Sequence, residues 1–358
     1  MKNSDVTPLS FIELPDSNTY EKPKLSGLRT PSGYTFFDNS TLEAARTCLR
    51  YYYFKHIRKF NPIGLRPPLI FGSSWHTAMD FFWPAASKGE KKEYIIEGSF
   101  SSFMEFWNES KISEVMDDID LYPRTPTKAH EVLIAYYNQY GEDLKRYEIL
   151  SVERPFIIPL TDDSQKLMYI GKLDKVTREI RTEETNIWDH KTASLLGQMW
   201  VNTFSPNSQM DGYHHSGKME FGKSFNNIYI DGVQIHKTKK PEFQRLIISR
   251  DISRIEAWLW ETLEKISEIQ YNEELLLSYR EGGKHLNFLP AFPKNCKMCA
   301  NQYGKPCVYR DICVYQNNPE DMEMNSEYFE EDLWSPFKIE EKNTKDGMTF
   351  VIDSQEGE

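Results

Sequence analysis

The stretch that decides the fold is residues 169–194, which read YIGKLDKVTREIRTEETNIWDHKTAS. Two runs rich in β-forming residues, 169–176 and 186–192, flank a charged and turn-prone segment. This arrangement predicts an antiparallel β-hairpin. Asp189 and Lys191 are two residues apart, so they share one face of the second strand.

Asp174 lies on the first strand of this hairpin, where its carboxylate can stand beside that of Asp189. Two carboxylates supply hard oxygen donors, which suit Mg²⁺ or Mn²⁺. The ammonium group of Lys191 could orient a water or offset the charge that develops on a phosphorane. The pattern Asp-x-Lys alone is common, and a charged strand face is usually only solvated, so the prediction of a metal site depends on the rest of the chain.

The letters GKLD that end at Asp174, followed by Asp189, His190 and Lys191, resemble the core of the PD-(D/E)xK nuclease superfamily, specifically its RecB-like branch. The resemblance implies a restriction-endonuclease-like fold of class α/β (α+β), with an αβββαβ core and a central mixed sheet flanked by helices. It also implies that Asp174, Asp189 and the carbonyl of His190 bind metal, and that Lys191 positions the attacking water.

Two further motifs of the branch are present on either side of the hairpin. His76 ends the run GSSWH, and the resemblance implies that its imidazole joins the metal. Gln209 and Tyr213 are four residues apart, so on a helix they share one face and can reach DNA or the active site. A lone histidine is more often structural, and such a Gln and Tyr pair is common. Their order around the hairpin is what makes them informative.

The chain has five cysteines, of which four lie in NCKMCANQYGKPCVYRDIC, residues 295–313. RecB-like nucleases of the AddB type and their CRISPR-associated relatives hold a 4Fe–4S cluster with one N-terminal and three C-terminal cysteines, and thiolate quartets suit such clusters. Because this chain has one cysteine too many, either Cys296 or Cys299 is spare, and we favour Cys299 as the ligand. The resemblance therefore implies a cluster on Cys48, Cys299, Cys307 and Cys313.

Two other interpretations of the cysteines remain open. A zinc site built from the four C-terminal cysteines would leave Cys48 as a buried thiol, and the spacing of Cys296 and Cys299 is common in zinc sites. The seven residues before Cys307 are awkward for a compact zinc ribbon. A disulfide scaffold is less favoured, because five is an odd number and nothing indicates secretion.

Charge is distributed unevenly along the chain. The net charge is −11, but residues 319–358 carry thirteen acidic and three basic residues, which leaves 41 acidic against 40 basic over 1–318. A near-neutral body can carry local basic patches that bind DNA. Residues 50–66 interleave basic and aromatic side chains, which fits either a nucleic-acid surface or a solvated helix face.

The remaining pattern predicts the elements around the hairpin. We expect a helix over 42–59 with Thr41 as its N-cap, and a partner helix over 74–86. Strands are expected at 147–159, 226–236 and 243–249, and a long helix at 251–278. Glu153 could approach the metal, but an exposed strand acid is the interpretation we favour. The expected regions are an extended segment at 1–35, a helical region at 36–146, the nuclease core at 147–280, a cysteine cap at 281–318 and an acidic tail at 319–358.

We therefore expect a metal-dependent DNA nuclease, an exonuclease acting on single strands or duplex ends, with a structural iron–sulfur cluster. End processing, recombination or repair beside a helicase or recombinase would fit, and the compact arrangement resembles phage-encoded members. A catalytically silent DNA-binding protein and a zinc-bearing endonuclease are the alternatives. No run approaches eighteen apolar residues and no signal peptide is evident, so we expect no membrane span and a cytoplasmic location, in the host cell if phage-encoded.

Overall fold

The computed structural model describes residues 35–64, 66–161, 166–282, 286–300 and 305–331. The expected extended segment, apart from residue 35, and most of the expected acidic tail lie outside these ranges. The chain divides into two compact units. The sheet unit contains the described residues of 65–158 and 172–255, and the cysteine unit contains those of 24–64, 159–171 and 256–358.

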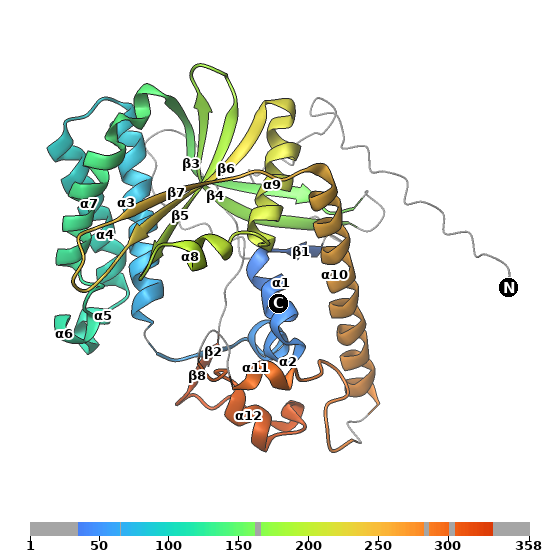
Figure 1. Cartoon of the computed structure of the whole chain (residues 1–358). Coiled ribbons are helices and arrows are strands. Elements are labelled where there is room, and N and C mark those ends of the chain that lie inside the picture. The colour runs from blue at the N-terminus through green and yellow to red at the C-terminus, as the bar shows by residue number, and fades with distance from the viewer. Residues whose placement is uncertain (1–34, 65, 162–165, 283–285, 301–304, 332–358) are drawn as a thin grey trace, which may run out of the picture. The chain divides into compact units, whose positions relative to one another are not determined.

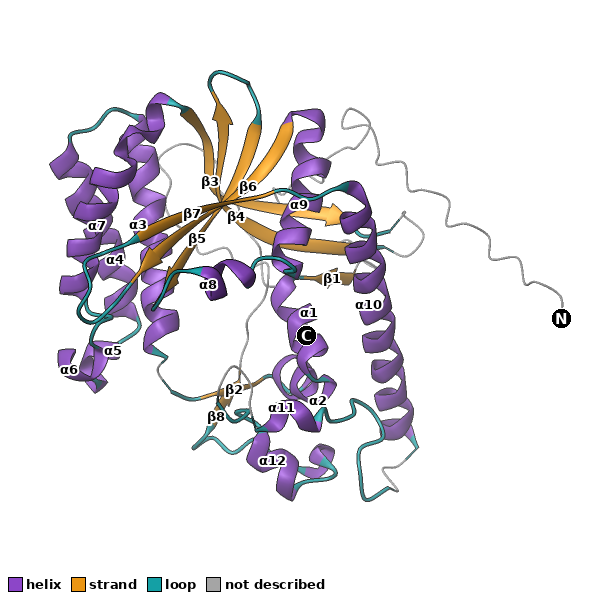
Figure 2. Ribbon diagram, viewed as in Figure 1, coloured by secondary structure: helices purple, strands orange, loops and turns teal. Residues whose placement is uncertain are grey.

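The sheet unit is built on a mixed sheet, whose strands fan out in Figure 2. β4 and β5 are antiparallel, β5 and β6 are parallel, and β6 and β7 are antiparallel, while β3 pairs with β4. The three strands expected outside the hairpin are confirmed to within two residues. The strands are β3 (Tyr147–Pro159), β4 (Leu167–Glu179), β5 (Thr185–Ala193), β6 (Phe225–Gln234) and β7 (Phe243–Ile248).

A layer of helices precedes the sheet in the chain and packs on it (Figure 1). Its core is rich in aromatic residues, including Trp75, Trp83 and Tyr136, and it also takes in Val233 of β6. The expected helix at 74–86 is part of a longer one that starts earlier, because the prolines at its first positions favour a helix start. The helices are α3 (Pro67–Ser87), α4 (Lys92–Glu109), α5 (Ile112–Val115), α6 (Asp118–Leu121) and α7 (Pro126–Tyr140).

The helix α8 (Gln198–Asn202) lies on the other face of the sheet. Neighbouring residues of β6 show this, because successive side chains of a strand point to opposite faces. Val233 faces the helical layer, while its neighbour Gly232 lies against α8. A Cβ atom on Gly232 would come 2.4 Å from the ring of Trp200, so this close approach requires glycine. The helix α9 (Ser208–Phe221) packs against β5 and β6, which it connects.

The cysteine unit holds short elements from both ends of the described chain. The strand β1 (Thr35–Phe37) runs parallel to the first residues of β4, and β2 (Phe60–Pro62) pairs with β8 (Phe329–Glu331). The helix expected at 251–278 is confirmed as α10 (Ile252–Glu281), most of which belongs to this unit. The remaining helices are α1 (Asn39–Thr47), α2 (Leu49–Tyr52), a π-helical turn (Tyr53–Ile57), α11 (Cys296–Cys299) and α12 (Arg310–Tyr315).

The single helix expected over 42–59 is wrong, because the chain breaks at Cys48. Cys48 has extended backbone, with φ −169° and ψ 124°, and separates α1 from α2. The expected N-cap is also wrong: Asp38 caps α1, since its Oδ1 accepts the Thr41 N–H at 2.7 Å. The break frees the Cys48 thiol from a helical face, and Sγ accepts the backbone N–H of Asn295 at 3.2 Å.

Two of the basic residues of 50–66 are not part of a solvated face, although Lys59 and Arg66 are exposed. Arg50 is buried, and its guanidinium donates to the carbonyls of Leu289, Ala291 and Phe292. Arg58 donates to the carbonyls of Pro319 and Met322. Neither a nucleic-acid surface nor a solvated helix face describes these two arginines. Their guanidinium groups instead satisfy the carbonyls of distant loops.

Among the described residues, no helix combines the length with the apolar character that crossing a bilayer requires.

Candidate active site

The predicted hairpin brings Asp174 to the end of the β4–β5 ladder. The paired residues run from Arg178 opposite Thr185 to Lys175 opposite Trp188. At the next position Oδ2 of Asp174 accepts the backbone N–H of His190 at 2.7 Å. The Asp174 carboxylate thus accepts the N–H that a carbonyl of the neighbouring strand would otherwise accept. This bond holds the carboxylate between β4 and β5.

Asp189 and Lys191 lie on one face of β5, as their spacing predicts. Nζ of Lys191 donates to Oδ1 of Asp189 at 2.9 Å, and the Asp189 side chain is 1% exposed while that of Lys191 is 31% exposed. Burial raises the pKa of Asp189, and the Lys191 ammonium opposes that rise. Burial would lower the pKa of Lys191, but Asp189 and then Asp174 outweigh it and raise that pKa. The lysine is therefore held charged, and its side chain remains partly exposed.

His76 reaches the same carboxylate from α3. Its Nδ1 lies 3.2 Å from Oδ2 of Asp174. Burial lowers the pKa of His76, but the charge and hydrogen bond of Asp174 outweigh burial and raise it to about 9. A Cβ atom on Gly72 would lie 3.6 Å from Oγ1 of Thr192, which is an ordinary contact distance, so α3 lies beside the end of β5 at this point. The GSSWH run thus brings the imidazole to the hairpin.

Glu153 belongs to this site, and the expectation that it is an exposed strand acid is wrong. Its side chain is 25% exposed and forms an ion pair with Lys172. Burial raises the pKa of Glu153, with Lys172 opposing the rise. Its φ of +47° is a left-handed conformation that is rare for a side-chain-bearing residue and redirects the carboxylate within β3. The only sequence feature that could have indicated this role is an acidic residue within a run of β-forming residues.

The donors fit a divalent metal. Ligand atoms of His76, Glu153 and Asp174 all lie within 4.8 Å of one another. Oδ2 of Asp189 is buried and has no hydrogen-bond partner among the described residues, which is costly unless a cation satisfies it. Carboxylate oxygens with one imidazole suit Mn²⁺ or Mg²⁺. Glu153 therefore joins the three metal-binding side chains predicted from sequence.

His190 is buried between these groups and the sheet interior. Neither ring nitrogen has a hydrogen-bond partner among the described residues, and burial lowers its pKa to about 3. The imidazole is therefore neutral. Its backbone N–H is used by Asp174. The predicted metal contact of its carbonyl remains a prediction.

Gln209 and Tyr213 share one face of α9, and the structure brings them together. Nε2 of Gln209 donates to the Tyr213 hydroxyl at 3.0 Å, and that hydroxyl donates to the carbonyl of Lys172 at 3.1 Å. Tyr213 is 6% exposed, so its hydroxyl fixes β4 two residues before Asp174. The predicted contact with DNA stays a prediction, and Gln209 is the more exposed of the two.

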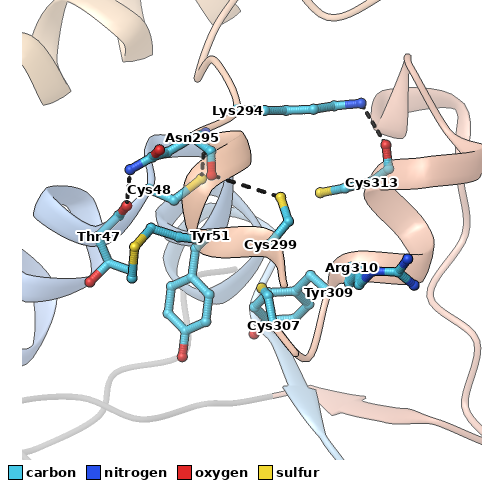
Figure 3. Close-up of a pocket in the computed structure, with 11 residues that line it drawn as sticks. Thr47, Cys48, Tyr51, Lys294, Asn295, Cys299, Cys307, Tyr309, Arg310 and Cys313 are labelled. Atoms are coloured by element: carbon cyan, nitrogen blue, oxygen red, sulfur yellow. Dashed lines mark hydrogen bonds between the residues drawn. The ribbon is translucent and has the colours of Figure 1, made fainter. Parts of the chain in front are cut away.

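The second candidate site is a pocket of the cysteine unit, shown in Figure 3. Four of the five cysteines line it, and Cys296 is not among its lining residues. Cys48 and Cys299 both contact the backbone of Asn295, and Cys313 on α12 points toward Cys299 (Figure 3). The lining cysteines are Cys48, Cys299, Cys307 and Cys313.

Basic groups surround these thiols. Lys294 lines the pocket and donates to the carbonyl of Cys313, and Arg310 lines it as well. Burial raises the pKa of Cys313 to about 12, while Arg50 and Lys294 oppose the rise. Without a metal Cys313 is therefore a protonated thiol. Bound iron or zinc would deprotonate the cysteines that hold it, and the nearby cations would stabilise the resulting thiolates.

The sequence matches one family model, and it is similar to two solved structures. The family model of the PD-(D/E)XK nuclease superfamily matches residues 39–313. The solved structure of a "putative exonuclease" from Eubacterium rectale is similar, with 13% sequence identity and a TM-score of 0.44, over 79% of this chain and 94% of that chain. The structure of a protein named SSO0001 has 11% identity and a TM-score of 0.24, over 52% of this chain and 92% of its own. No curated protein matches the sequence.

The chain belongs to the PD-(D/E)XK nuclease superfamily. Its mixed α/β architecture, with a central mixed sheet flanked by helices, is the restriction-endonuclease-like fold of that superfamily. The protein is thus a hydrolytic nuclease by class.

Proposed function

We propose that the protein is a Mg²⁺- or Mn²⁺-dependent deoxyribonuclease that acts as an exonuclease. The observation that carries this proposal is the position of Asp174, whose carboxylate is fixed by the His190 N–H and His76 and completes a compact group of ligand atoms with Glu153. Together with Asp189, these side chains would hold the metal. The ion would polarise the phosphodiester and lower the pKa of a water.

The residues of the chain account for the remaining steps. Lys191, held by Asp189, would orient the water and offset negative charge on the phosphoryl oxygens. Attack of that water on phosphorus forms one P–O bond and breaks the bond to the 3′ oxygen, which takes a proton and leaves a 5′-phosphate. Tyr213 would keep β4 in position by its bond to Lys172, and Gln209 would steer the strand.

We further propose that Cys48, Cys299, Cys307 and Cys313 hold a structural 4Fe–4S cluster, which would place the protein in the RecB-like branch. The four line one pocket, while Cys296 is exposed. A zinc site on the four C-terminal cysteines would need Cys296 instead of Cys48. The pocket therefore favours the cluster, and iron and zinc analysis of anaerobically purified protein separates the two.

The biological setting belongs to the same proposal. DNA end processing in recombination or repair, beside a helicase or recombinase, fits a compact nuclease of this branch, as does a phage-encoded protein in a host cytoplasm. Of the five regions proposed from sequence, the nuclease core at 147–280 would cut DNA and the cysteine cap at 281–318 would stabilise the fold. A catalytically silent DNA-binding role is not favoured, because Asp174, Asp189 and Lys191 are intact and brought together.

One experiment tests the activity. End-labelled linear DNA and circular DNA, each single- and double-stranded, are incubated with the protein and Mn²⁺. Loss of label from linear DNA with circles left intact supports an exonuclease. Cutting of circles would make the enzyme an endonuclease, and no cleavage with any metal or substrate would contradict the proposal.

A further inference from the structure

A basic surface lies at the carboxyl end of β5, beside the candidate active site and within the sheet unit. Ser194 directly follows β5 and is three residues after Lys191, which corresponds to about 10 Å along a strand. Three segments meet there. They are the residue after β5, the loop between α6 and α7, and the turn between β6 and β7.

Arg124, on the loop between α6 and α7, is the first element of this surface. Its Nη2 donates to Oγ of Ser194 at 2.8 Å. Arg124 is half-buried, yet none of the described carboxylates forms an ion pair with it, and its Nε has no hydrogen-bond partner among the described residues. The nearby Asp117 instead caps α6 by accepting the N–H groups of Ile119 and Asp120. A partly buried guanidinium usually has an anionic partner, so this one is suited to an external anion.

The turn between β6 and β7 is the second element. β5 and β6 are parallel, and the Ile235 N–H donates to the carbonyl of Ala193 at 2.8 Å, which places the turn at the same end as Ser194. The hydroxyl of Tyr122 donates to the carbonyl of Lys237, so the arginine loop and the turn are joined.

The turn is also held in shape from within. Nδ1 of His236 accepts the backbone N–H groups of Thr238 and Lys239 at 3.2 and 3.3 Å. The side chains of Lys237, Lys239 and Lys240 are exposed, and no ion pair joins them to a carboxylate in the described part of the chain. Three cations are thus presented to solvent on a turn of defined shape.

We propose that Arg124 and the three lysines of this turn bind the phosphates of a single-stranded nucleic acid that leads into the active site. Lysine and arginine contacts to phosphates fix the position of a strand without reading its sequence. The inference rests on the proposed nuclease function and adds the strand that the site accepts. Arg124 would bind a phosphate close to the scissile bond, and the turn would bind phosphates farther along.

Exposed apolar side chains on Tyr122 and on the segment that follows Ser194 favour a single strand. Leu195 is 60% exposed, Met199 is 87% exposed and Tyr122 is 44% exposed. Unpaired bases present apolar faces that such side chains can cover, and aromatic rings stack on them. A duplex hides these faces in its interior, so it would leave the exposed apolar groups without a role.

The test measures binding of short fluorescent DNA to the full chain carrying Lys191→Ala, which makes cleavage slow compared with binding, in the presence of Mn²⁺. Adding Arg124→Ala should weaken single-strand binding about tenfold, because one charge-assisted phosphate contact is lost. The triple change Lys237→Ala, Lys239→Ala and Lys240→Ala should reduce the slope of log Kd against log salt by about 2. Arg181→Ala, an exposed arginine at the other end of β5, is the matched control and should change neither quantity.

The outcomes separate this inference from the function on which it rests. If the Lys191→Ala protein binds no nucleic acid, the proposed function fails. If it binds DNA but Arg124→Ala and the lysine triple match Arg181→Ala, the phosphate surface is wrong. Tighter binding of a blunt duplex, with the same loss in Arg124→Ala, would overturn the single-strand assignment. The exposed lysines keep the test decisive even if Arg124→Ala reduces folding.

Discussion

The two candidate sites of this chain are assembled in opposite ways. The metal site takes most of its groups from neighbouring strands, and the carboxylates of Asp174 and Asp189 are nearly inaccessible. The cysteine pocket joins Cys48 to residues about 250 positions later in the sequence, and its thiols are only partly buried. The first site is defined by strand register, whereas the second depends on closing a very long loop.

This difference has an energetic side. Burying the Asp189 carboxylate with one unsatisfied oxygen lowers the stability of the sheet unit in the absence of a cation. Metal bound by distant cysteines does the reverse, since it restricts the unfolded chain and contributes to folding. Changes in the first site should therefore reduce cleavage while the fold persists. Changes in the second should lower the free energy of unfolding.

The largest expected effect is on cleavage by the Lys191→Ala protein. Removing a charge that acts on the transition state should lower the rate about 10³-fold while DNA binding persists, because the lysine adds little to ground-state affinity. Single-turnover cleavage of end-labelled DNA and a binding titration measure the two quantities. Lys223→Ala, an exposed lysine elsewhere in the unit, is the control. Wild-type cleavage by Lys191→Ala would remove this lysine from the mechanism.

The next effect concerns the cysteine pocket, where two single changes form a matched pair. Cys48→Ala should lose the bound iron and about 5–6 kcal/mol of stability in the chain-entropy model, because a loop of roughly 250 residues is no longer closed. Cys296→Ala should keep both. Iron content, visible absorbance and thermal unfolding of anaerobic protein report the outcome. One zinc per chain, lost in Cys296→Ala and kept in Cys48→Ala, would replace the cluster with a zinc site.

The positions of the candidate metal-site residues were better predicted from the sequence than the structure of the cysteine unit, for the same reason. Strand periodicity places Asp189 and Lys191 on one face whatever surrounds them. In the structure the two side chains are hydrogen-bonded to each other. The helix breaks at Cys48, whose thiol accepts the Asn295 N–H, and no local pattern contains that distant contact. Arg50 and Arg58 read as a surface because their distant carbonyl partners are invisible in sequence. Glu153 was misjudged because its direction depends on one left-handed residue within a strand.

A smaller effect is expected from the buried carboxylates. Asp174→Asn and Asp189→Asn should each raise the Mn²⁺ concentration needed for half-maximal cleavage about tenfold or more, since each removes an anionic oxygen ligand. His76→Ala should be milder with Mg²⁺ than with Mn²⁺, which accepts imidazole more readily. Without metal, Asp189→Asn should unfold at a higher temperature than the wild type, because a buried charge is gone. Unchanged Mn²⁺ affinity in all three variants, measured by calorimetry, would rule out the site.

The smallest expected effect, and the sharpest test of how far the metal site extends beyond the hairpin, is that of Glu153→Gln. The amide keeps an oxygen donor and the length of the side chain, so only the charge is removed. Part of that charge is already offset by the ion pair with Lys172. We expect the Mn²⁺ requirement to rise about threefold to fivefold with little change in the maximal rate. Glu148→Gln is the matched control, because Glu148 lies on the same strand and pairs with the exposed Arg178 away from the ligand group. If the two variants have the same metal requirement, Glu153 is a structural partner of Lys172, and the ligands reduce to those of α3 and the β4–β5 hairpin.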